Sequence, residues 1–163
     1  MGTEIKSREE LVDEIANALQ ENFEYIDTFN YIDLDKNEIG MSIDDITVCD
    51  ELFPKDGEAI VRIDPLESRE SFGCMEDFAD QVTDKRKQEH LYRALNRRHP
   101  FSTFKYAVED TDLLQDWYHF RDEWYKDKAE EWMEDNEVDF KNGHITAKNP
   151  EMFHRDDETD EWD

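Results

Sequence analysis

Cysteine is scarce in this sequence, which contains Cys49 and Cys74 and no CxxC pair. Two such cysteines cannot supply the disulfide framework on which small secreted domains depend. Long hydrophobic runs are also missing: no apolar stretch approaches the length of a membrane span, and the N-terminal MGTEIKSREE has no apolar signal-peptide region. These absences predict a protein of the reducing cytoplasm that does not associate with membranes.

Basic residues are few. The chain has 163 residues, and its 19 Lys and Arg against 45 Asp and Glu give a net charge of −26. Such a charge keeps a protein soluble and repels nucleic acid, so we expect no direct nucleic-acid binding by the surface as a whole. The balance is uneven, because residues 85–128 hold ten basic and eight acidic side chains. The sequence therefore predicts a polarised molecule with one face unlike the rest.

Motifs of known chemistry are missing as well. Ser42, Ser71 and Ser102 lie in no G-x-S-x-G turn, and the five histidines form no HExxH and no i, i+4 pair. With so many acidic residues, paired carboxylates carry no information, because some will meet by chance. We predict no catalytic residue, no metal ligand and no cofactor; whether the protein is an enzyme stays open, and the sequence favours that it is not.

One stretch resembles a calcium-binding loop. In DLDKNEIGMSID, Asp33, Asp35, Asn37 and Asp44 occupy positions 1, 3, 5 and 12 of an EF-hand. Glu38, however, stands where the loop needs glycine, and the preceding FNYI is typical of a strand rather than a helix. We therefore favour a β-hairpin whose turn residues happen to be acidic.

The N-terminal half combines one helix with strands. An S-x-x-E capping box followed by apolar residues at helical spacing predicts a helix over residues 8–22. β-Branched and aromatic residues on both sides of residues 35–37 predict a hairpin over 28–43, and EAIVRID predicts a third strand over 58–64. Residues 44–57 fit either a short helix or a loop.

In the C-terminal half, the spacing of apolar residues predicts helices. Apolar stripes predict helices after Pro65, with a break at Pro100, which starts a short helix of its own. Asp112 is in position to cap a long helix that runs to about Asn136. Asn142 and the glycine after it are a turn signal, which fits either a small hairpin or a loop.

Together these elements predict an α+β fold. We expect a small antiparallel sheet of about three strands packed against about five helices, with the C-terminal half all-helical. Residues 1–150 are expected to form a single domain and residues 151–163 a solvated acidic tail.

The long helix carries an aromatic stripe, DWYHFRDEWYKDKAEEW, with two cations inside it. Arg121 and Lys128 lie two turns apart near the middle of the aromatic arc. We favour the interpretation that their stems cover ring surface while their charged ends reach an acidic neighbour or stack on a ring. The alternative is a cationic pocket completed by preceding helices. The candidate binding residues on that alternative are Arg97, Lys105, Trp117, Arg121, Trp124 and Lys128.

The segment RALNRRHPFSTFKYAVEDTDLLQDWYHFRDEWYKDKAEEWMEDN resembles the C-terminal part of the bacterial uncharacterised protein family 0158. The similar positions are Phe101, Phe104, Lys105, Trp117, Tyr118, Phe120 and Trp132, with Met133 in place of leucine. Where the family has a Gly-x-Gly-Ala run, this chain has Arg97-Arg98-His99-Pro100. The resemblance supports the fold and implies no activity.

Charge and motifs together favour a cytoplasmic, non-enzymatic interaction protein that binds a basic protein partner. One version of this function is mimicry of nucleic-acid charge in the basic groove of another protein. The alternative is a small-anion or nucleotide-binding protein, in one version an enzyme, that uses the cationic pocket described above. The sequence does not indicate an oligomeric state.

Overall fold

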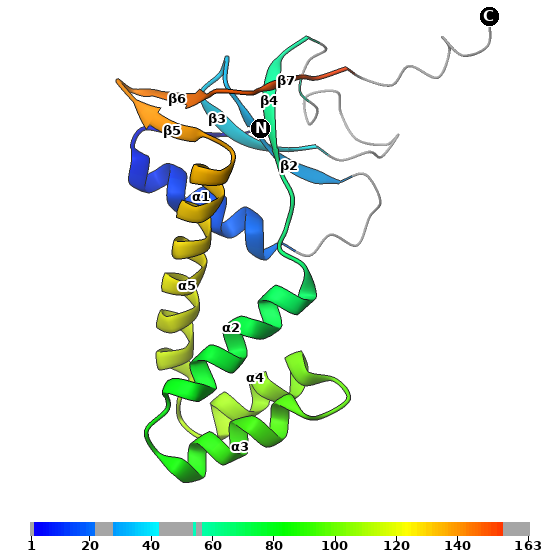
Figure 1. The fold of residues 1–163 in the computed structure, drawn as a ribbon, viewed down its shortest axis with the longest axis vertical. Helices are drawn as coiled ribbons and strands as arrows, with labels where there is room; N and C mark the ends of the chain where they lie inside the picture. Colours follow the sequence, from blue (N-terminus) through cyan, green and yellow to red (C-terminus); the bar gives the residue numbers. More distant parts are fainter. Residues whose placement is uncertain (1, 22–27, 43–53, 55–56, 155–163) are drawn as a thin grey trace, which may run out of the picture. The chain divides into compact units, whose positions relative to one another are not determined.

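A computed structural model describes residues 2–21, 28–42, 54 and 57–154. The chain divides into two compact units, the first comprising Met1–Pro65 and Ala129–Asp163 and the second Leu66–Lys128. The described residues form helices together with antiparallel strands, which confirms the predicted α+β class (Figure 1). The single domain predicted over residues 1–150 stays a prediction.

In the described part of the chain, the first unit holds α1, the end of α5 and the strands. Its larger sheet has the order β1-β3-β2-β4-β7 with antiparallel neighbours, and β5 and β6 form a separate two-stranded sheet (Figure 1). Helix α1 contacts both β4 and β5. The elements are β1 Thr3–Glu4, α1 Arg8–Gln20, β2 Phe29–Asp33, β3 Glu38–Ser42, β4 Ala59–Ile63, β5 Val138–Lys141, β6 His144–Ala147 and β7 Glu151–Met152.

Local signals explain α1 and the first hairpin. The Ser7 side chain accepts a hydrogen bond from the Glu10 N–H at 3.1 Å, and the Glu10 carboxylate accepts from the Lys6 N–H at 3.2 Å, so the start of α1 is capped as predicted. Strands β2 and β3 confirm the predicted hairpin. Asn37 turns the chain between them with a φ of 57°, a left-handed conformation that asparagine tolerates better than most residues.

Three strands follow α5, so the expectation of an all-helical C-terminal half holds only as far as Asp135. Asn142 and Gly143 have φ values of 54° and 81°, and both central residues of a type I′ hairpin turn need positive φ. Strand β7 was expected to belong to the acidic tail, but it pairs with β4 instead. Backbone hydrogen bonds from Phe153 to Glu58 and from Gly57 to Phe153, both 2.8 Å, extend this edge of the sheet.

The second unit is a cluster of helices. Its elements are α2 Ser68–Gln81, α3 Lys85–Leu95, α4 Pro100–Asp110 and α5 Leu114–Asp135, whose residues from Ala129 onward belong to the first unit. Each of these helices was predicted. Phe78, Leu91, Phe104 and Val108 are completely or almost completely buried and form the centre of the unit.

Asp112 has a different role from the predicted one. It lies two residues before α5 begins and takes a φ of 58°. The Leu113 N–H donates to Val108 O at 2.8 Å and the Asp112 N–H donates to Glu109 O at 3.2 Å. This is the Schellman arrangement, which usually has glycine at the left-handed position. Asp112 therefore closes α4 instead of capping α5.

The predictions for residues 44–53, 55–56 and 155–163 lie outside the described residues, and so does Asp44 of the calcium-loop pattern. No helix in the described part of the chain has both the length and the apolar character needed to cross a membrane.

Candidate functional site

The aromatic stripe of α5 is a wall of the second unit's core. Trp117 is 9% exposed, and its ring centroid lies 5.0 Å from that of Phe104 and 5.4 Å from that of Phe78, in edge-on contacts. Phe120 also contacts Phe78, at 5.4 Å. Such ring pairs stabilise a core beyond the area they bury. The aromatic residues of the stripe are therefore part of the hydrophobic core of the second unit.

Two polar contacts fix the outer part of the stripe. The Trp124 indole N–H donates to an oxygen of Asp77 at 3.1 Å, and the Tyr125 hydroxyl donates to Ser71 Oγ at 3.0 Å. Burial raises the pKa of Tyr125. Both contacts join α5 to α2, and a buried hydroxyl needs such a partner.

Arg121 and Lys128 cover rings of their own helix. The Arg121 guanidinium lies 4.9 Å from the Tyr118 ring centroid, and its Nη2 is 3.2 Å from Asp122 Oδ1. The Lys128 ammonium lies 5.1 Å from the Trp124 ring centroid. These are the contacts of the interpretation favoured from sequence, in which the two cations shield aromatic surface.

The other candidate binding residues lie elsewhere in the second unit. Arg97 is exposed in the turn between α3 and α4, and Lys105 is exposed on α4. The structure brings Trp124 and Lys128 together, whereas Arg97 and Lys105 lie on other elements, the α3–α4 turn and α4. None of the six candidates lines the cleft that the structure shows among the described residues of this unit.

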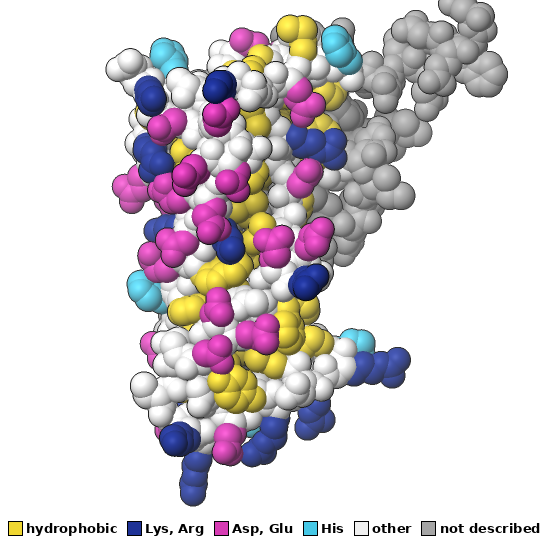
Figure 2. Space-filling model, viewed as in Figure 1, with side chains coloured by type: hydrophobic (Ala, Val, Ile, Leu, Met, Phe, Trp, Pro, Cys, Tyr) yellow, Lys and Arg dark blue, Asp and Glu magenta, His cyan; other side chains and the backbone are white. Residues whose placement is uncertain are grey.

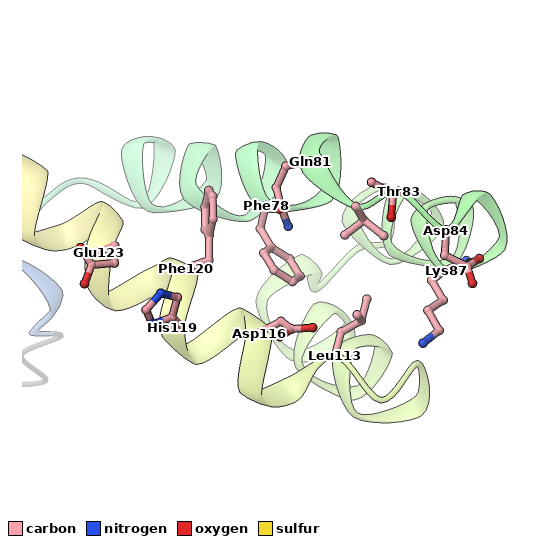
Figure 3. Close-up of a pocket in the computed structure, with 11 residues that line it drawn as sticks. Phe78, Gln81, Thr83, Asp84, Lys87, Leu113, Asp116, His119, Phe120 and Glu123 are labelled. Atoms are coloured by element: carbon pink, nitrogen blue, oxygen red, sulfur yellow. Dashed lines mark hydrogen bonds between the residues drawn. The ribbon is translucent and has the colours of Figure 1, made fainter.

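That cleft has a volume of about 600 Å³ and lies where the end of α2 faces the start of α5 (Figure 3). Phe78 and Phe120 point toward the facing helix, and charged groups of both signs line the cleft. The lining contains three carboxylates, one lysine and one histidine, and neither serine nor cysteine. It consists of Phe78, Gln81, Val82, Thr83, Asp84, Lys87, Leu113, Asp116, His119, Phe120 and Glu123.

Sequence reasoning identified the apolar residues of the cleft but not the cleft itself. Phe78 and Phe120 both belong to apolar stripes read from helical spacing. Asp116, His119 and Glu123 follow the same spacing on α5, which by itself indicates only a solvated face. No local signal says that α2 ends opposite them, because that depends on the packing of two helices far apart in sequence.

A buried acid pair in the first unit joins Asp33, at the end of β2, to Glu58, just before β4. Asp33 is completely buried, and its Oδ1 accepts hydrogen bonds from the N–H groups of Asp35 and Lys36, both at 3.0 Å. Its Oδ2 accepts no hydrogen bond from a donor in the described part of the chain. Burial, and then a shared hydrogen bond with Glu58, raise the pKa of Asp33 to about 6. Lys36 Nζ lies 3.6 Å from Glu58 Oε1 and partly offsets the negative charge of the acid pair.

This geometry differs from a calcium loop. The Asn37 amide donates to the carbonyl oxygens of Ile5 and Gly143, both at 3.0 Å, and accepts from the Ile145 N–H at 2.7 Å. Asn37 thus fastens the β2–β3 turn to the β5–β6 hairpin. Among the described residues there is no group of three or more His, Cys, Asp or Glu able to hold a metal ion.

Carboxylates gather where α1 meets the end of α5 in the first unit, and Figure 2 shows them crowded over α1. The Arg8 guanidinium bridges the elements, with contacts of 2.7 Å to Glu130 and 3.0 Å to Asp139. Arg8 lowers the pKa of Glu130, whereas burial and then Glu10 and Asp13 raise the pKa of Glu14. We name this surface the acidic face; it comprises Glu9, Glu10, Asp13, Glu14, Glu130, Glu131, Glu134, Asp135 and Asp139.

Comparisons with known proteins identify relatives but no chemistry. Residues 5–148 match the model of an uncharacterised protein family, UPF0158. Over 90 residues the chain is 38% identical to a Pseudomonas aeruginosa protein named "UPF0158 protein PA5073"; the match covers 55% of this chain and 59% of that protein. No solved structure matches. The motifs of the aromatic helices, the α+β fold and the match over residues 5–148 agree, and the chain belongs to the uncharacterised protein family UPF0158.

Proposed function

We propose that the protein is a non-enzymatic interaction protein of the cytoplasm and that its acidic face binds a basic surface of another protein. One observation carries the proposal: nine carboxylates lie on α1, the last turns of α5 and β5, and the arginine that bridges these elements, Arg8, is already paired with two of them. Carboxylates at this density attract a basic surface before contact and favour the oriented encounter.

Repulsion within the acidic face supports the same proposal. Burial raises the pKa of Glu14 first, and the neighbouring charges of Glu10 and Asp13 raise it further, so like charges already oppose one another in the free protein. A cationic partner relieves that repulsion, which adds to the attraction between unlike charges. A partner that ordinarily binds nucleic acid belongs to this class, because its groove presents the required rows of Lys and Arg.

The alternative of a small-anion or nucleotide-binding protein has no comparable support. The cleft beside α2 carries three carboxylates to one lysine, and Arg121 and Lys128 are engaged with rings of their own helix.

A pair of charge-matched variants tests the proposal. The face variant combines Glu9→Gln, Glu134→Gln and Asp135→Asn, and the control combines exposed positions of the second unit in Glu76→Gln, Glu109→Gln and Asp127→Asn. Binding of a fluorescein-labelled oligolysine peptide is followed by anisotropy at low and at physiological salt. With exposed ion pairs contributing about 0.2–1 kcal/mol each, the face variant should bind about 3- to 100-fold more weakly at low salt. Equal losses in the two variants would show that only net charge matters and would refute the acidic face.

A further inference from the structure

A basic surface lies in the second unit of this acidic protein. Residues 85–105, which form α3, the following turn and the first half of α4, hold seven of the chain's 19 Lys and Arg and one of its 45 Asp and Glu. Figure 2 shows these side chains projecting from the end of the unit that carries α3. We name this the basic surface; its cations are Lys85, Arg86, Lys87, Arg93, Arg97, Arg98 and Lys105.

Most of these cations have no acidic partner in the described part of the chain. Within the described residues, Arg93 makes an ion pair with Glu89 at 3.7 Å, and the other six side chains make none. Elsewhere in the chain, Arg8 and Arg62 pair with carboxylates at 3.1 Å or less. Cations placed side by side without a counter-charge repel one another, and an external polyanion removes that cost.

Aromatic rings lie exposed among the cations. Tyr92 is 38% exposed, Phe101 46% and Tyr106 67%, and they are three of the five large apolar residues exposed in the described part of the chain. Two of the rings are held in place. The Tyr92 hydroxyl donates to Asp80 at 2.5 Å, and Phe101 meets the Phe72 ring edge-on with centroids 6.5 Å apart. Along α4, Phe101 and Lys105 are one turn apart, so ring and cation are neighbours on the exposed side.

We propose that the basic surface binds single-stranded nucleic acid. Charge alone would suit any polyanion, but exposed rings on the same two helices as cations that make no ion pair among the described residues suit single strands, whose bases stack on rings while Lys and Arg follow the phosphates. The whole-chain charge of −26 opposes such binding at long range. At physiological ionic strength, however, exposed charges beyond about 8 Å are largely screened, so a phosphate on this surface responds mainly to the local cations.

Salt dependence provides the first test. The probe is a fluorescein-labelled single-stranded oligouridine, with affinity measured by anisotropy over a series of KCl concentrations. If all six unpaired cations contact phosphates, log K should fall against log salt with a slope of about −4, and the double variant Arg97→Gln, Arg98→Gln should reduce the steepness by about 1.4. The control, Lys6→Gln with Lys141→Gln, removes two exposed cations of the first unit and should leave the slope unchanged.

Stacking provides the second test. Tyr106→Ala removes a ring that is mostly exposed, so the fold should persist, which circular dichroism checks. Affinity for oligouridine should fall about 5- to 100-fold with the salt slope unchanged. Four outcomes overturn the proposal: no binding up to about 100 µM protein at low salt, equal losses in both double variants, full affinity in Tyr106→Ala, or competition by polyglutamate as strong as by unlabelled oligouridine. The last two outcomes would indicate that the basic surface binds an acidic protein instead.

Discussion

Replacing Asp33 by asparagine should stabilise the protein at neutral and alkaline pH. The Asp33 carboxyl is completely buried beside Glu58, whose side chain is 13% exposed, and no donor among the described residues bonds to Asp33 Oδ2. In the folded protein its pKa is raised to about 6, first by burial and then by the shared hydrogen bond with Glu58. An asparagine has nearly the same shape. Its amide oxygen can still accept hydrogen bonds from the N–H groups of Asp35 and Lys36. Its NH₂ group can donate to the Glu58 carboxylate, so no carboxyl proton is needed to join the two side chains.

The pKa of Asp33 sets the size and sign of the effect. The unfolded state releases this proton near pH 4 and the folded state near pH 6, so between these values the folded state binds more protons and the free energy of unfolding falls as pH rises. The loss amounts to at most about 3 kcal/mol above pH 6 and is absent below pH 4. Asp33→Asn should therefore raise the melting temperature by up to about 6–12 °C at pH 8 and by little at pH 4.

Thermal unfolding followed by circular dichroism at pH 4, 6 and 8 measures this difference. Glu4→Gln, an exposed carboxylate of the same unit, is the charge-matched control and should show no such pH-dependent gain. If Asp33→Asn is less stable than the natural protein at pH 8, or if its gain is the same at all three pH values, then Asp33 does not share a proton with Glu58 and the reasoning is wrong.

Three further substitutions test other parts of the fold. Asn37→Asp keeps the left-handed turn but loses two donors and sets a carboxylate against two carbonyl oxygens, so urea unfolding should show a loss of about 2–4 kcal/mol, more than Asn37→Gly. Asp112→Gly should stabilise the protein by about 1 kcal/mol in the same assay, because glycine adopts positive φ without steric cost. Arg8→Gln should cost less than about 1 kcal/mol, since its ion pairs are half-exposed, and the loss should shrink in 1 M NaCl as screening grows.

Much of the fold could be predicted because its signals are local. The capping box at Ser7 and the apolar spacing after Pro65 specify helices within a few residues, whatever the rest of the chain does. Strands β1 and β7 have only two residues each, which is too short for any periodic pattern. They are strands because β3 and β4 offer edges to pair with, and edge pairing depends on residues distant in sequence.

The candidate sites were harder to predict for the same reason. Asn37 and Asp33 have the spacing of calcium ligands, but in the structure the Asn37 amide bonds to Ile5, Gly143 and Ile145, more than 30 residues away in either direction. The burial of Asp33 depends on the chain just before β4, which carries Glu58. Spacing along the chain identifies which side chains share a face of an element. It does not show which other part of the protein packs against that face.

The net charge of the whole chain conceals how charge is distributed over the surface. A net charge of −26 governs forces at long range, whereas binding is decided where a partner touches the surface, within the screening length of about 8 Å. On that scale the chain presents both signs, with nine carboxylates on the acidic face and seven cations on the basic surface. If both proposals hold, raising salt weakens oligolysine and oligouridine binding alike, yet Arg97→Gln with Arg98→Gln reduces only oligouridine binding and the acidic-face variant reduces only oligolysine binding. Net charge alone predicts that the arginine double variant would strengthen oligolysine binding and that the acidic-face variant would strengthen oligouridine binding, so this pair of measurements separates local from global electrostatics.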